Sequence, residues 1–314
     1  MPPNLVIFTG SANPALAEAI AENLGGRVGR RTLARFPDTE LHVEIEETVR
    51  GANVYIVQPT SPPVDQQLIE LFFLADACRR AGAERLTAIM PYFGYARQDR
   101  RASGRDAVGA RLVADLLAAS GLDRIVAVDL HSPTLEGFFT VPLEHLSAVE
   151  LLANAARDLV GPDAVIVAPD LGAVKLGERY ADLLHLPMAV AHKIRLSGTA
   201  VKVREIVGDV RGRRPVIIDD MISTGATIEA AARALLEAGC VPGFTVVATH
   251  ALLVGPANDR LAAIGLRHLI VTDSVVPALT PAGLTQVVSL APMLAEVIAR
   301  LNTGESLDEF VSHR

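Results

Sequence analysis

Residues 216–227 read Val-Ile-Ile-Asp-Asp-Met-Ile-Ser-Thr-Gly-Ala-Thr, which indicates a strand, a turn and the start of a helix. Three β-branched residues form an apolar run that is typical of a buried strand. Asp219 and Asp220 follow where we expect this strand to end, and a helical pattern begins at Ile228. This order of elements predicts an α/β fold, in which polar groups gather at the carboxyl ends of strands.

The turn at 223–227 has the chemistry of a phosphate site. Small polar residues before a helix expose backbone N–H groups at the positive end of the helix dipole, which favours a phosphate dianion. Asp219 and Asp220 can accept hydrogen bonds from the hydroxyls of a sugar whose phosphate lies in the turn. The simpler alternative is an ordinary junction with an Asp cap, but a cap needs one carboxylate and no Thr-Gly-Ala-Thr.

Short apolar runs alternate with helix-length segments throughout the chain. Such alternation predicts βαβ units and mainly parallel sheets with helices on both faces. We expect strands at 5–8, 54–57, 86–90, 125–128, 164–168, 188–191, 216–218, 245–248 and 269–272, and helices at 14–24, 66–80 and 107–119.

The two halves of the chain resemble each other. One strand, helix and strand unit has its helix end at Gly82, and a second has its helix end at Gly239, 157 residues later (239 − 82). We predict two similar α/β domains, 1–145 and 146–314, joined near residues 142–147. Chance similarity between two βαβ units is the alternative.

Composition narrows the function classes. The chain has 314 residues, half of them apolar, and a net charge of -7, which argues against a nucleic-acid scaffold. Its two cysteines lack metal-type spacing and are typical of buried thiols in a reducing compartment. We expect no secretion signal and no membrane span, and therefore a cytoplasmic protein.

Two loops combine aromatic and charged side chains. Residues 35–40 place one aromatic ring before two spaced carboxylates, which can stack on a base and accept hydrogen bonds from its amine; a solvated turn explains them equally well. Residues 91–101 bring three aromatics and three arginines together in a chain that is only 4% aromatic. Arginines there can clamp a polyphosphate in a bidentate manner, and Gln98 can reach a base or ribose.

Three further loops carry candidate residues at strand ends. His131 follows an apolar strand, a position at which a lone histidine is usually structural. Asp170 leads into a Gly turn and can hold Mg²⁺ through oxygen. Lys193 and Arg195 share one face of an extended segment, where two cations suit charge that develops on a transferring phosphoryl group, although surface charge alternation is the alternative.

Three segments in this order carry a specific resemblance: Pro-Tyr-Phe-Gly-Tyr-Ala-Arg-Gln-Asp-Arg-Arg, Val-Asp-Leu-His and Asp-Asp-Met-Ile-Ser-Thr-Gly-Ala-Thr-Ile. Over essentially its whole length the chain resembles the ribose-phosphate diphosphokinase (phosphoribosyl pyrophosphate synthetase) family. The resemblance implies two phosphoribosyltransferase-type domains, each with a mainly parallel sheet flanked by helices. It also implies transfer of the diphosphoryl group of MgATP to the C1 hydroxyl of ribose 5-phosphate, which gives 5-phosphoribosyl 1-diphosphate and AMP.

The resemblance implies a role for each matching position. Phe36, Asp38 and Glu40 would hold adenine, in the active site of a neighbouring subunit, and Arg97, Gln98, Asp99 and Arg101 would bind ATP. His131 and Asp170 would contact Mg²⁺, and Lys193 and Arg195 would stabilise the transition state. Ribose 5-phosphate would be held by Asp219, Asp220, Ser223, Thr224, Gly225, Ala226 and Thr227. The implied assembly is a homo-oligomer, a homohexamer built from dimers.

Some residues depart from the family pattern. Thr39 and Ala226 stand where members commonly have Gly, and a Cβ at Ala226 alters the loop if the backbone there needs a positive φ. Gly109 stands where Thr is usual, and Ala107 where Pro is common. Two alternatives stay open: a nucleobase phosphoribosyltransferase, which needs no ATP site, and a non-catalytic regulatory subunit.

Overall fold

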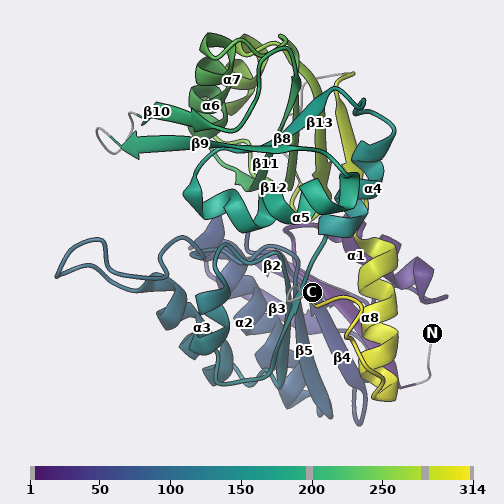
Figure 1. Cartoon of the computed structure of the whole chain (residues 1–314). Coiled ribbons are helices and arrows are strands. Elements are labelled where there is room, and N and C mark those ends of the chain that lie inside the picture. The colour runs from purple at the N-terminus through teal and green to yellow at the C-terminus, as the bar shows by residue number, and fades with distance from the viewer. Residues whose placement is uncertain (1–3, 196–200, 277–282, 312–314) are drawn as a thin grey trace. The chain divides into compact units, whose positions relative to one another are not determined.

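The computed structural model describes residues 4–195, 201–276 and 283–311, and the side chains of residues 193–204 lie outside that description. The chain divides into two compact units, Met1–Ser147 with Ser289–Arg314, and Ala148–Val288 (Figure 1). Each unit contains a parallel or mainly parallel sheet with flanking helices. The predicted α/β class is therefore confirmed.

The first unit is built on a five-stranded sheet in the order β1-β4-β5-β6-β7, with all strands parallel. These strands are β1 (Leu5–Thr9), β4 (Asn53–Val57), β5 (Arg85–Met90), β6 (Arg124–Val128) and β7 (Leu143–Leu146). The helical segments are α1 (Pro14–Asn23), α2 (Val64–Arg80), α3 (Gly109–Ala119), the 3-10 turn η1 (Pro133–Phe138) and α8 (Ala291–Thr303). A separate antiparallel hairpin joins β2 (Arg31–Arg35) to β3 (Leu41–Ile45).

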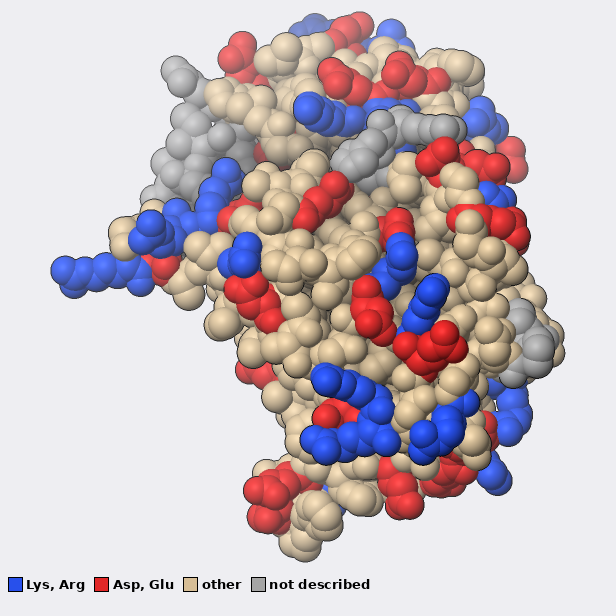
Figure 2. All heavy atoms as spheres, turned by 90° about the horizontal axis from the view of Figure 1, so that it is seen from below, with Lys and Arg blue, Asp and Glu red and all other residues tan. Residues whose placement is uncertain are grey.

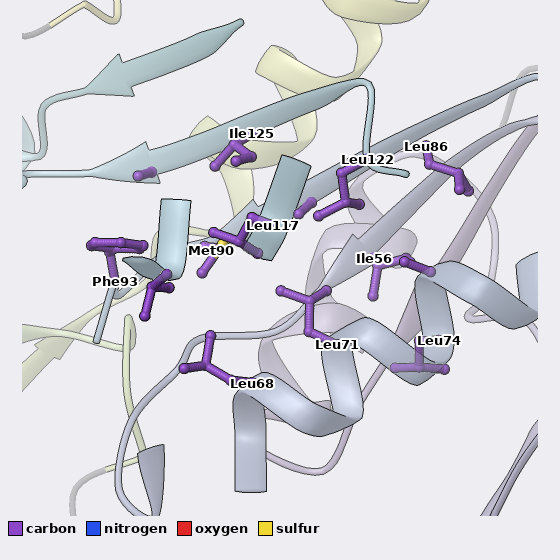
Figure 3. Packing of buried hydrophobic residues seen from close by; sticks show 14 of the residues in the cluster. Ile56, Leu68, Leu71, Leu74, Leu86, Met90, Phe93, Leu117, Leu122 and Ile125 are labelled. Carbon is purple, nitrogen blue, oxygen red and sulfur yellow. The ribbon is translucent and has the colours of Figure 1, made fainter. Parts of the chain in front are cut away.

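The core of the first unit forms where α2 packs on the sheet. Leu68, Leu71 and Leu74 recur at three-residue spacing on α2 and are buried. Figure 3 shows them beside Ile56 and Met90 of the sheet. Each fully buried leucine contributes about 1.5–3 kcal/mol relative to an exposed one, so this helix face fixes α2 on the sheet.

The second unit has a seven-stranded sheet in the order β10-β9-β8-β11-β12-β13-β14, in which only β10 runs antiparallel to its neighbour. Its strands are β8 (Ala164–Ala168), β9 (Met188–Arg195), β10 (Val201–Val207), β11 (Arg214–Ile222), β12 (Phe244–Ala251), β13 (Leu266–Thr272) and β14 (Thr285–Val288). Its helical segments are α4 (Val149–Arg157), the 3-10 turn η2 (Leu171–Ala173), α5 (Val174–Leu184), α6 (Ala226–Glu237) and α7 (Ala257–Ala263).

The resemblance between the halves extends to single backbone hydrogen bonds. The N–H of Gly51 donates to the carbonyl of Gly82 at 2.9 Å, and the N–H of Gly212 donates to that of Gly239 at 2.9 Å. Gly82 and Gly239 have φ values of +90° and +88°, a region that glycine enters without steric cost. The shared closure of β4-α2-β5 and β11-α6-β12 favours a repeated unit over chance similarity.

Strand β11 is longer than predicted. It extends through Asp219 and Asp220 to Ile222, because β12 continues to pair with it as far as Ala251. The two carboxylates therefore lie inside a strand and not after it. Successive side chains of a strand point to opposite faces, so Asp219 and Asp220 approach the strand end from two sides.

The two compact units differ from the predicted division of the chain. Residues 142–147, expected to join two domains, contain β7, which pairs with β6 in the first sheet. Residues 289–314 group with the first unit, although the predicted second domain was 146–314. The reason is helix α8, whose buried Leu294, Val297 and Ile298 form an apolar face, and which lies beside α1 in Figure 1.

The surface carries both signs of charge. Figure 2 shows acidic and basic side chains interspersed with other residues across one face of the molecule. Among the described residues no helix is long and apolar enough to cross a membrane.

Candidate active site

The predicted phosphate turn connects β11 to α6 in the second unit. Gly225 has a φ of +74° and directly precedes the first residue of α6, Ala226. The positive φ therefore falls on the glycine, and Ala226 has the backbone of a helix start. Its Cβ does not strain the turn, contrary to the concern raised by the family pattern. The N–H groups at the start of α6 supply the donors and the positive dipole end that a phosphate needs.

Three carboxylates lie near the ends of neighbouring strands β8 and β11. The carboxylate Oδ1 of Asp219 accepts the N–H of Asp220 at 3.0 Å. Burial raises the pKa of the Asp219 carboxyl well above its ordinary value, and the nearby charges of Asp220 and Asp170 raise this pKa further. This concentration of negative charge suits sugar hydroxyls, which donate hydrogen bonds, and cations.

Asp219→Asn is expected to stabilise the folded protein at about pH 8 and to change its stability little near pH 4. A carboxyl whose pKa is raised by folding contributes stability below its ordinary pKa of 3.8, and this contribution is lost as the pH rises through the raised value. Asparagine cannot ionise and so avoids the loss. The melting temperatures of the wild type and Asp219→Asn, compared between pH 4 and pH 8, measure the effect. Each kcal/mol of stability difference corresponds to a shift of about 2–4 °C. A shift that is equal at every pH would contradict this explanation.

Asp170 follows the end of β8 by two residues and is the N-cap of η2. Its Oδ1 accepts the N–H groups of Gly172 at 2.8 Å and Ala173 at 3.2 Å, so the carboxylate caps this turn. An oxygen ligand of this kind is what Mg²⁺ prefers. Across the described residues no group of three His, Cys, Asp or Glu side chains forms a metal site by itself. An ion held by one carboxylate and by substrate phosphates requires no such group.

The backbone of Lys193 and Arg195 lies in β9, which pairs with β10. In this register Lys193 is opposite Val203, and Arg195 is opposite Val201. The extended conformation predicted for this segment is thus present. The side chains of Lys193 and Arg195 lie outside the described residues.

In the first unit, Phe36, Asp38 and Glu40 occupy the tip of the β2–β3 hairpin. The N–H of Phe36 donates to the carbonyl of Glu40, and that of Thr39 donates to the carbonyl of Phe36, both at 2.9 Å. Phe36 is 51% exposed, and its ring centroid lies 5.5 Å from that of His42. The exposed ring precedes the carboxylates of Asp38 and Glu40 at this tip, and its role in holding a base stays a prediction.

Thr39→Gly is expected to stabilise the protein by about 0.5–1 kcal/mol. Thr39 has a φ of +77°, which is a strained conformation for a β-branched residue. Glycine removes this strain, and the greater freedom of the unfolded chain offsets only part of the gain. Urea unfolding of both proteins measures the difference. A lower midpoint for Thr39→Gly would show that the turn carries no strain.

Residues 97–101 lie in the connection between β5 and α3. Arg97, Gln98 and Arg101 are exposed, and the carbonyl of Gln98 accepts the N–H of Ala110 at 3.2 Å. A Cβ added to Gly109 would meet Oε1 of Gln98 at 2.5 Å. The absence of a side chain at Gly109 thus leaves room for Gln98 at the start of α3. Asp99 is half-buried, with its carboxylate 3.6 Å from the guanidinium of Arg100.

Two residues that no sequence pattern indicated hold the loop that carries His131. The N–H of Leu130 donates to Nε2 of buried His145 at 2.9 Å. Nδ1 of His145 lies 2.6 Å from Oε1 of Glu136. Because Nε2 is an acceptor, the imidazole proton is on Nδ1 and is donated to Glu136. No local signal identified this pair, since His145 lies in the segment predicted as a joint.

Comparison with known proteins agrees with these features. A family described as the N-terminal domain of ribose phosphate pyrophosphokinase matches residues 5–121, and one described as the phosphoribosyl synthetase-associated domain matches residues 199–311. A ribose-phosphate pyrophosphokinase of Caldanaerobacter subterraneus subsp. tengcongensis is 41% identical over 98% of this chain and 97% of its own length. The chain belongs to the ribose-phosphate pyrophosphokinase family. A pyrophosphokinase of Listeria ivanovii is 40% identical over 97% of this chain and 96% of its own.

A solved structure supports the same family. The crystal structure of phosphoribosylpyrophosphate synthetase from Mycobacterium smegmatis has a TM-score of 0.87 and 39% sequence identity. It covers 96% of this chain, and 99% of that chain is covered in return. The predicted family is thus confirmed over both units of this chain.

Proposed function

We infer that this chain transfers the diphosphoryl group of ATP to the C1 hydroxyl of ribose 5-phosphate, which gives 5-phosphoribosyl 1-diphosphate and AMP. The observation that carries this conclusion is an acidic strand that leads directly into a phosphate turn, in a chain similar to pyrophosphokinases over 98% of its length. A nucleobase phosphoribosyltransferase would need the phosphate turn but no ATP site.

The second unit holds the sugar. The N–H groups of residues 223–227 and the α6 dipole bind the 5-phosphate. The residues of this turn are Ser223, Thr224, Gly225, Ala226 and Thr227. Asp219 and Asp220 accept hydrogen bonds from the ring hydroxyls, and this orients the C1 hydroxyl for attack.

The first unit holds the nucleotide. Phe36 stacks on the adenine, and Asp38 and Glu40 accept hydrogen bonds from its amine, as the exposed hairpin tip allows. Arg97 and Arg101 neutralise the phosphates through charge-assisted hydrogen bonds, with Gln98 and Asp99 beside them.

In the reaction, the C1 oxygen forms a bond to the β-phosphorus while the bond from that phosphorus to the α,β-bridging oxygen breaks. AMP leaves with the bridging oxygen, and the hydroxyl proton is released. Lys193 and Arg195 stabilise the negative charge that develops on the transferring group. Positioning and neutralisation lower the barrier without a strong base.

Asp170 and His131 are the residues that would hold Mg²⁺ in this enzyme. The carboxylate of Asp170 has the oxygen chemistry that this ion prefers, and the imidazole of His131 is exposed at a strand end. The ion supplies neutralisation of phosphate charge.

We also propose a cytoplasmic homo-oligomer, a homohexamer built from dimers, in which the hairpin tip serves the active site of a neighbouring subunit. The two free cysteines are buried, as expected in a reducing compartment. Two helices expose large apolar side chains at four-residue spacing that a second copy can cover: Ile69 and Phe73 of α2, and Leu112 and Leu116 of α3. Light scattering after size-exclusion chromatography tests the subunit number.

Product analysis tests the reaction. Purified protein with ATP, ribose 5-phosphate and Mg²⁺ should release AMP, and release should require all three. Base-dependent release of pyrophosphate from 5-phosphoribosyl 1-diphosphate would instead support a phosphoribosyltransferase. Inactivity alone, together with a changed rate in an active relative, would support a regulatory subunit.

A further inference from the structure

A second segment of the second unit holds the phosphate turn through the carbonyl groups of the turn. The carbonyl of Ile222 accepts the N–H of Leu253 at 3.0 Å, and the carbonyl of Ser223 accepts that of Val254 at 3.0 Å. These donors follow β12, about thirty residues later in the sequence. The backbone of Leu253 has a φ of +45°, a conformation that non-glycine residues rarely adopt.

Arg260 of helix α7 continues this pattern with its side chain. Its Nη1 donates to the carbonyl of Thr224 at 2.9 Å, and its Nε lies 3.1 Å from a carboxylate oxygen of Glu229 in the first turn of α6. The carbonyl of Gly225 accepts the N–H of Glu229 at 2.9 Å. Four consecutive carbonyls, from Ile222 to Gly225, are therefore engaged.

This arrangement determines where the N–H groups of the turn point. In a trans peptide the carbonyl of one residue and the N–H of the next point in opposite directions. Holding the Thr224 carbonyl toward α7 therefore directs the N–H of Gly225 to the other side of the turn. In the same way, the engaged carbonyls of Ile222, Ser223 and Gly225 direct the N–H groups of the residues that follow them, Ser223, Thr224 and Ala226, in the opposite direction. A set of N–H groups fixed before the ligand arrives binds an anion without a cost of ordering.

We propose that Arg260 is a positioning residue for ribose 5-phosphate. Its guanidinium joins the Thr224 peptide to Glu229 and so keeps the turn in its phosphate-binding form. It acts from behind the turn through the Thr224 peptide. This rests on the proposed assignment of residues 223–227 to the 5-phosphate.

Steady-state kinetics of Arg260→Ala test the proposal. We expect KM for ribose 5-phosphate to rise by about 10-fold to 100-fold, the scale of one hydrogen bond from a charged group, while KM for ATP changes by less than about twofold. Arg260→Lys should restore part of the loss, because an ammonium can donate to the Thr224 carbonyl but lacks the fork that also engages Glu229. Isothermal titration of wild type and variants with ribose 5-phosphate provides a direct reading of binding.

Arg233→Ala is the matched control. Arg233 pairs with the same Glu229, but its side chain is 72% exposed and lies on α6 itself. Its loss should leave both KM values unchanged. A similar rise from Arg233→Ala, or an equal rise of both KM values in Arg260→Ala, would overturn the proposal, because either result would indicate a general effect on the fold.

Thr227→Val separates the two levels of inference. An unchanged KM for ribose 5-phosphate in Thr227→Val would contradict the assignment of the turn itself. A raised KM in Thr227→Val with a normal KM in Arg260→Ala would leave the assignment standing and refute only the role of Arg260. If Arg260→Ala does not fold, a normal KM for ribose 5-phosphate in folded Arg260→Lys, with Glu229→Gln also normal, refutes that role.

Discussion

Lys193→Ala is expected to lower kcat by about 100-fold to 1,000-fold, the typical result of removing one group that stabilises charge in a transition state. We expect Lys193 to make its strongest contact with the diphosphoryl group in the transition state, when the β-phosphorus lies between the two oxygens. A lysine that acts at that point lowers the barrier and contributes little to the binding of either substrate. KM for both substrates should therefore stay within a few fold.

Lys202→Ala is the control for this experiment. Lys202 is the other lysine of the β9–β10 hairpin, and its backbone pairs with Ile194 and not with Lys193. It should retain normal turnover. AMP release under saturating substrates measures kcat for both variants, and near-normal turnover of Lys193→Ala would remove this residue from the mechanism.

Asp220→Asn is expected to raise KM for ribose 5-phosphate by about 10-fold to 100-fold. An ionised carboxylate accepts hydrogen bonds from two neighbouring hydroxyls, whereas an amide offers one oxygen and turns two hydrogens toward the sugar. The loss of a charged acceptor corresponds to about 1.5–3 kcal/mol in binding. KM for ATP should change little, because this carboxylate is assigned to the sugar alone.

Asp209→Asn provides the comparison, since it is the same chemical change at a side chain that is 75% exposed in the same unit. It should leave both KM values unchanged. Titration with ribose 5-phosphate measures binding directly. Wild-type affinity in Asp220→Asn would show that the hydroxyls bind elsewhere.

Most of the strands predicted correctly are buried on both faces. Runs such as 164–168 and 246–248 are continuous and apolar because helices cover both sides of a parallel sheet. The strands that were not predicted lie at the edges of the two large sheets or outside them. β7, β10 and β14 are edge strands of their sheets, and the β2–β3 hairpin stands apart, so polar residues interrupt their apolar pattern.

Local sequence determined the α/β class, the repeated βαβ unit and the turn at 223–227, because each depends on residues that are neighbours in the chain. A strand, a glycine with positive φ and a helix start follow one another closely in the chain, so the turn is formed by local sequence. Only the tertiary structure brought Arg260 to the carbonyl of Thr224, 36 residues away, and His145 to the N–H of Leu130. It also placed the last helix beside the first. Contacts between distant residues depend on packing of the whole unit, and a pattern read along the chain carries no signal of which surfaces will meet.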